Sequence, residues 1–162
     1  MPVTPQVDTV IEDRRWQDAG LAPLAGQAVG AVVRHMGIAA TAEVVVMGCN
    51  NRRIAALNAD FRGKPVPTNV LSWPAEALGP DQPGGQPHPP LGDELGDIAI
   101  AWETCAAEAA AAARPMAAHI RHLIVHATLH LLGYDHETDA DAALMEGLEV
   151  EILGNLGDPS PY

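Results

Sequence analysis

The segment that most restricts how this chain can fold runs from Met116 to Leu132 and reads MAAHIRHLIVHATLHLL. Its composition predicts a helix whose apolar residues lie on nearly every side, with Arg121 and Thr128 as its clearest polar positions. A helix that is apolar around most of its circumference is normally buried. The sequence therefore predicts a long helix that the rest of the chain covers.

Four histidines lie on one side of this helix. A turn of about 100° per residue brings together His119, His122, His126 and His130. Buried imidazoles need partners, because burial disfavours the charged ring and each neutral ring has a donor and an acceptor to satisfy. We expect His119 and His122 to be exposed helical residues, with roles behind the metal ligands or toward RNA as the alternative.

A metal site is predicted at the carboxyl end of this helix. His126 and His130 are four residues apart, the spacing that helical zinc sites use, and Gly133 lets the chain reverse so that His136 reaches the same point. Three neutral nitrogen ligands favour one Zn²⁺ per chain with an open fourth position, as in catalytic sites, with another divalent transition metal as the alternative. Ordinary hydrogen-bonded histidines are the alternative. Asp135 either orients a ligand imidazole from behind or simply stabilises the turn.

The remaining patterns predict one α+β domain spanning residues 1–162, with a small mixed sheet and a late layer of helices. Residues 79–92 are rich in proline and glycine and predict a flexible surface loop. Periodicity, caps and stop signals place the elements. Strands are expected at 5–11, 42–48, 68–74 and 95–102, and helices at 24–37, 50–63, 103–113, 116–132 and 139–153.

The charge distribution points in two directions. A net charge of −12 ordinarily argues against a nucleic-acid partner. However, Arg52, Arg53, Arg62 and Lys64 are four of the nine basic residues and fall within thirteen positions, so they form a candidate phosphate-binding patch; a solvated helix face is the alternative. The two cysteines form no recognisable framework, and no signal or membrane-spanning segment is evident, so we expect a cytoplasmic protein.

Three segments carry a resemblance to a known family. HATLHLLGYDHE, LNADFRGKPVPTNVLSWP and LGDIAIAWE, in a match from about Glu43 to Leu153, resemble the YbeY family of bacterial endoribonucleases, which are rRNA maturation factors. The resemblance implies a zinc-dependent RNase that prefers single strands and acts in small-subunit rRNA maturation and ribosome quality control. It also implies a zincin-like metal-bearing helix, rRNA and the small subunit or its assembly proteins as partners, and an activity-associated Arg62 near the metal.

The sequence departs from the family pattern at Asn69, where aspartate is usual, and at Trp73, where phenylalanine is usual. Whatever charge that aspartate contributes is absent here. Two alternatives to a nuclease stay open. One is a metallopeptidase-like hydrolase, although Ala127 stands where a helical metalloprotease has its glutamate base. The other is a non-catalytic ribosome assembly protein with a structural metal.

Overall fold

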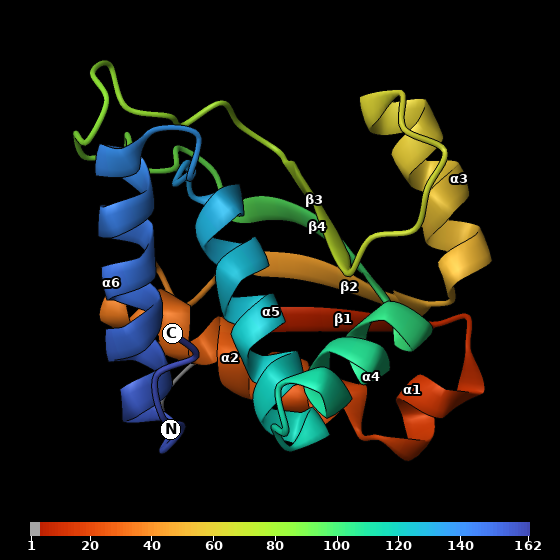
Figure 1. Cartoon of the computed structure of the whole chain (residues 1–162). Coiled ribbons are helices and arrows are strands. Elements are labelled where there is room, and N and C mark those ends of the chain that lie inside the picture. The colour runs from red at the N-terminus through yellow and green to blue at the C-terminus, as the bar shows by residue number, and fades with distance from the viewer. Residues whose placement is uncertain (1–3) are drawn as a thin grey trace.

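The computed structural model describes residues 4–162, and its centre is a four-stranded sheet in the order β1-β2-β4-β3 (Figure 1). Strands β1, β2 and β4 are parallel, whereas β3 pairs with β4 in the antiparallel direction. The prediction of a single α+β domain with a small mixed sheet is confirmed. The strands are β1 (Gln6–Ile11), β2 (Glu43–Cys49), β3 (Val70–Pro74) and β4 (Glu94–Ala101).

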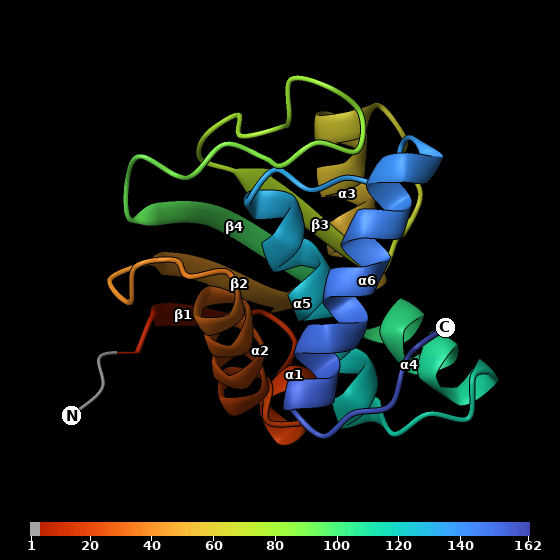
Figure 2. The ribbon, with the colours of Figure 1, turned by 90° about the vertical axis from the view of Figure 1, so that its left-hand side faces the viewer.

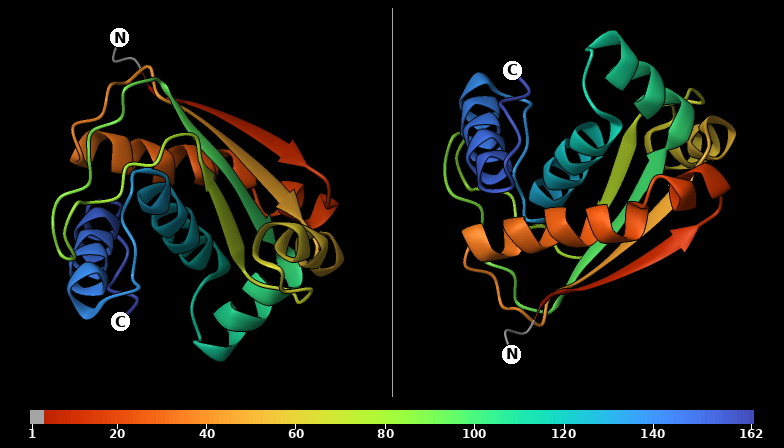
Figure 3. Two further views of the ribbon diagram at one scale, coloured as in Figure 1. Left: turned by 90° about the horizontal axis from the view of Figure 1, so that it is seen from above. Right: turned by 90° about the horizontal axis from the view of Figure 1, so that it is seen from below.

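The helices cover the sheet unequally. One face packs against α2 and α5, α6 lies against α5, and α3 lies on the opposite face (Figures 2 and 3). The six helices of the described residues are α1 (Arg14–Asp18), α2 (Leu21–His35), α3 (Asn51–Arg62), α4 (Trp102–Ala111), α5 (Met116–Leu131) and α6 (Asp139–Asn155).

Alternation along β4 explains how one strand serves two cores. Ile98 and Ile100 face the large core with α2 and α5, whereas Ala99 and Ala101 face a smaller cluster around Ile54 of α3. Successive side chains of a strand point to opposite faces, so a strand buried on both sides reads as a continuous apolar run. The same run therefore holds α5 on one side and α3 on the other.

Helix α5 is the buried helix that the sequence predicts. Ile120, Ile124, Val125, Leu129 and Leu131 are fully buried, and α5 contacts α2, α4, α6 and two strands. Burying a side chain of this size contributes about 1.5–3 kcal/mol. The helix that carries the histidine stripe is thus held on several sides.

The predicted strands and long helices are all present, with boundary shifts of a few residues. The short helix α1 was not predicted. It begins after Asp13, whose side chain accepts a hydrogen bond from the Arg15 backbone, and it buries Trp16, whose indole N–H donates to the Cys49 carbonyl at 2.8 Å. Residues 79–92 form neither helix nor strand. Within residues 4–162, no helix combines the length and the apolar character needed to cross a bilayer.

Candidate metal centre

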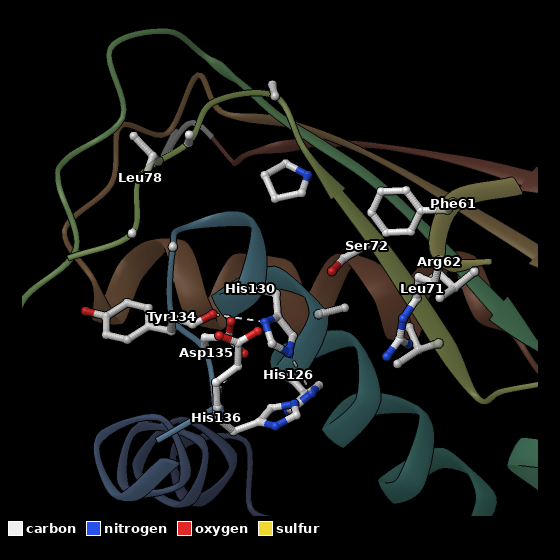
Figure 4. A pocket seen from close by; sticks show the side chains of 18 of the residues that line it. Phe61, Arg62, Leu71, Ser72, Leu78, His126, His130, Tyr134, Asp135 and His136 are labelled. Carbon is white, nitrogen blue, oxygen red and sulfur yellow. Dashed lines mark hydrogen bonds between the residues drawn. The ribbon is translucent and has the colours of Figure 1, made fainter. Parts of the chain in front are cut away.

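The three predicted ligands meet at one point. One ring nitrogen from each of His126, His130 and His136 lies within 4.8 Å of the other two, and Figure 4 shows the rings turned toward one another. The first two project from the last turns of α5. The third comes back from the segment after Gly133, whose φ of +99° is a conformation that favours glycine. An added Cβ at Gly133 would lie 2.6 Å from the Leu78 backbone.

The partners of two rings determine which nitrogen carries the proton. His130 Nδ1 lies 2.9 Å from the Tyr134 carbonyl oxygen, and His126 Nδ1 lies 3.4 Å from Glu149 Oε1. A carbonyl can only accept, so His130 Nδ1 bears hydrogen, and the carboxylate that faces His126 Nδ1 favours hydrogen on that atom as well. Both Nε2 atoms consequently have free lone pairs.

These two Nε2 atoms lie only 3.1 Å apart. Two lone pairs at that distance repel each other unless a proton or a cation lies between them. Two imidazoles bound tetrahedrally at about 2.0–2.1 Å from Zn²⁺ would have nitrogens about 3.3 Å apart. The geometry and the chemistry of the donors therefore fit a metal ion held by His126, His130 and His136.

Burial and neighbouring groups set the ionisation states of His130 and Glu149. Burial, reinforced by the neighbouring His126, lowers the pKa of His130 to about 4, so this ring is neutral near pH 7. Metal ligands must be deprotonated to bind. Burial alone would raise the pKa of Glu149, but the hydrogen bond from His122 and the close approach of His126 outweigh it and hold this pKa at about 2.

Glu149 is a functional candidate that sequence reasoning missed. Its carboxylate contacts His126 and is 1% exposed, on the face of α6 that also buries Met145, Ile152 and Leu153. The sequence did contain a signal for it: Glu149 stands at a helical spacing from Met145, Ile152 and Leu153 where an apolar core residue would be expected. Asp135, by contrast, accepts a hydrogen bond from the His136 backbone N–H at 2.7 Å, which is the turn-stabilising role considered as its alternative.

The expectation that His119 and His122 are exposed is wrong. His119 is buried and its Nε2 lies 3.0 Å from Glu108 Oε1, while His122 Nε2 lies 2.8 Å from Glu149 Oε1. Both glutamates come from helices that pack beside α5. Helical periodicity within α5 correctly grouped the histidines but contained no information about these partners.

The histidine cluster opens into a cleft of about 990 Å³ between β3, the segment that follows it, and the end of α5. Arg62 and the half-exposed Phe61, from the carboxyl end of α3, line the same cleft (Figure 4). Phe61 packs against Trp73 with ring centroids 5.3 Å apart. The cleft thus combines a metal-ligand set, a cation and an aromatic face.

The other basic residues lie outside the lining of this cleft. Arg52 and Arg53 are at the amino end of α3, about 15 Å from Arg62 at a rise of 1.5 Å per residue. Arg53 also forms an ion pair with Glu12 at 3.2 Å. Lys64 is exposed just beyond the helix. The four charges are therefore spread along α3 and not gathered at one point.

Asn69 lines the cleft, but its amide group is turned toward α4. Its Nδ2 donates to both carboxylate oxygens of Glu108, at 3.1 and 3.2 Å, and its Oδ1 accepts from the Val70 backbone at 2.7 Å. Asparagine therefore suits this position, because its amide can donate to the acidic neighbour Glu108, which an aspartate could not do.

Together, the fold and the site define a small α+β protein with a cluster of three histidines that could hold a metal ion at the mouth of a cleft. Comparison with known proteins is consistent with this class. The family model described as Endoribonuclease YbeY matches residues 6–157. The chain belongs to the YbeY family.

Several relatives are similar over nearly their whole length. The Endoribonuclease YbeY of Paracoccus denitrificans is 57% identical, over 96% of this chain and 89% of the relative. The protein of the same name from Dinoroseobacter shibae is 54% identical, over 99% of this chain and 92% of the relative. The solution structure of TM1509 from Thermotoga maritima shares the fold, with a TM-score of 0.58 and 19% identity, covering 96% of this chain and 98% of that one.

Proposed function

We propose that this protein is a zinc-dependent endoribonuclease that prefers single-stranded RNA, and that residues 1–162 form one such hydrolase domain. The observation that carries the proposal is the convergence of His126, His130 and His136 at a cleft that Arg62 also lines. Family membership supports it, because the relatives bear the name endoribonuclease.

The chemistry follows from the residues of the cleft. A bound Zn²⁺ would supply a Lewis acid that polarises a phosphoryl oxygen or lowers the pKa of a water molecule. Arg62 would offset the negative charge that builds up on the phosphate during cleavage. Phe61 offers an exposed face on which a base can stack, a contact that favours unpaired strands. Arg52, Arg53 and Lys64 would bind phosphates of RNA that extends beyond the cleft.

The biological role that we propose is cytoplasmic, in maturation of small-subunit rRNA and in ribosome quality control. The substrate would be rRNA, and the partners would be the small subunit or its assembly proteins. This role rests on the family resemblance of the histidine segment and of the segments around Arg62 and β4.

Replacement of metal ligands and of the cleft arginine tests the proposal. His126→Ala and His130→Ala should abolish both zinc retention, measured by elemental analysis, and cleavage of a small-subunit rRNA precursor. Arg62→Glu should keep the zinc and lose most of the cleavage, because it reverses a charge without touching a ligand. Full activity in a metal-free double histidine variant would overturn the metal centre, and unchanged kinetics of Arg62→Glu would remove its role.

One observation favours a second candidate, a metal-dependent peptidase. Strand β3 is at the edge of the sheet and lines the cleft, so its free backbone groups could pair with an extended peptide. Ala127 remains an argument against this function, because it cannot act as the proton acceptor. Cleavage of a peptide panel, with single-stranded RNA left intact, would favour the peptidase.

A structural metal in a non-catalytic assembly protein is less well supported. Structural zinc sites are usually closed by four protein ligands. Here the third ligand, His136, is exposed and the cluster faces the cleft. Zinc binding without cleavage of any RNA in the panel would favour this alternative.

A further inference from the structure

Glu149 is a buried carboxylate without a cationic arginine or lysine partner in the described part of the chain. Its contacts are His122 Nε2 at 2.8 Å, His126 Nδ1 at 3.4 Å, and the Tyr162 hydroxyl, which donates at 3.1 Å to either oxygen. Burying a carboxylate costs free energy unless it is paired and hydrogen-bonded. Retaining such a group in the core therefore calls for a reason beyond packing.

Contacts with Arg114 determine which ring nitrogen of His119 and of His122 carries the hydrogen. Arg114 Nη1 lies 3.3 Å from His122 Nδ1 and 3.4 Å from His119 Nδ1. A guanidinium can only donate, so both Nδ1 atoms are acceptors and both Nε2 atoms bear hydrogen. His122 consequently donates to Glu149, just as His119 donates to Glu108.

The carboxylate is thus held by His122 and Tyr162 and faces His126 as an acceptor. A facing acceptor keeps hydrogen on Nδ1 of His126 and leaves Nε2 free to bind a metal. The ring is also held at the angle that directs Nε2 toward His130. Carboxylates behind ligand histidines commonly fix the tautomer and raise the basicity of the ring.

We propose that Glu149 is a positioning residue of the metal centre, which holds His126 in its metal-binding tautomer and orientation and adds a negative charge that offsets the charge of a divalent cation. This inference rests on the proposed metal centre. It assigns a role to α6, which contributes none of the three ligands. Tyr162 and His122 act one step further out, by holding the carboxylate.

The test compares Zn²⁺ affinity in the wild type, Glu149→Gln and Tyr162→Phe, by competition with a chromophoric chelator. Glutamine keeps the volume but lacks a second oxygen for the converging donors. We expect its affinity to fall 10- to 100-fold, the usual effect of losing such a partner. Tyr162→Phe removes one of the donors, and we expect a loss of about two- to fivefold.

Asp158→Asn is the matched control. Asp158 is a second buried carboxylate, paired with Arg121 at 2.6 Å, and it does not contact the histidine cluster. This variant should lose stability and keep the Zn²⁺ affinity of the wild type. Absorption spectra of the Co²⁺-loaded proteins provide a second readout, which should change in Glu149→Gln and stay unchanged in Asp158→Asn.

Each result decides between the hypotheses. Equal Zn²⁺ affinities and Co²⁺ spectra for the wild type and Glu149→Gln would overturn the role of Glu149 and leave the metal centre intact. A wild-type protein that binds no Zn²⁺ would overturn both. If Glu149→Gln fails to fold, Tyr162→Phe decides, and an affinity equal to that of the wild type then refutes the inference.

Discussion

The hydrogen bonds between Asn69, which lines the cleft, and Glu108 can be tested by substitution. Its amide donates to both oxygens of Glu108 at 3.1 and 3.2 Å. The substitution Asn69→Asp introduces the aspartate that the resemblance to the family led us to expect at this position. In this chain, however, it replaces a donor with a second carboxylate and turns a hydrogen bond into a repulsive contact.

The distance sets the size of the expected effect. Two unit charges 3.1 Å apart repel by about 5 kcal/mol at an effective dielectric constant of about 20. The Glu108 side chain is 41% exposed, so it can rotate toward water and solvent screens much of this energy. Allowing for that, and for the lost hydrogen bond to a charged group, we expect Asn69→Asp to reduce the free energy of unfolding by about 2–3 kcal/mol at pH 7.

Urea unfolding of four proteins measures this effect: the wild type, Asn69→Asp, Glu108→Gln and the double variant. In the double variant the amide introduced at position 108 can donate to the new carboxylate, so the original hydrogen bond is reversed instead of lost. We expect the double variant to recover most of the stability, with an interaction energy above about 1 kcal/mol. A loss of the same size in both backgrounds, or no loss at all, would refute this account of the contact between Asn69 and Glu108.

Three further outcomes follow from the structure. Gly133→Ala should lower the free energy of unfolding, measured in urea, by roughly 2–4 kcal/mol, because φ is +99° and the new Cβ would clash with the Leu78 backbone. An unchanged urea midpoint would contradict this turn geometry. Phe61→Ala should weaken binding of single-stranded RNA by about 1–3 kcal/mol in a filter-binding assay, without altering Zn²⁺ content, and equal affinity would exclude stacking there. The free energy of unfolding of the metal-free protein should fall by on the order of 3 kcal/mol between pH 7 and pH 4 in urea unfolding. The reason is that His130 becomes protonated near pH 6.5 in the unfolded chain but only near pH 4 in the folded protein. The variant His130→Ala should show a smaller fall.

Local rules of helix and turn geometry were sufficient to predict the cluster of three histidines. His126 and His130 are one turn apart on α5, and His136 follows a glycine turn within six residues of His130. Few conformations satisfy these short-range constraints, so the convergence of the three rings is decided almost entirely by neighbouring residues. The same holds for the cap of α3 at Asn50 and for its end at Gly63.

The surroundings of the site depended on contacts between distant segments. Glu149 reaches His126 because α6 packs on α5, and Glu108 reaches His119 because α4 lies beside the same helix. Arg62 joins the cleft because α3 crosses the opposite face of the sheet and ends beside β3.

Sequence alone therefore determined the strands, the long helices, the buried helix and the convergence of the three histidines, because each depends on residues within a few turns of one another. Only the tertiary structure decided which carboxylate lies behind His126, why His119 and His122 are covered, and what Asn69 faces. The physical reason is that a buried polar group is satisfied by whichever partner the packing of the whole chain brings within hydrogen-bonding distance.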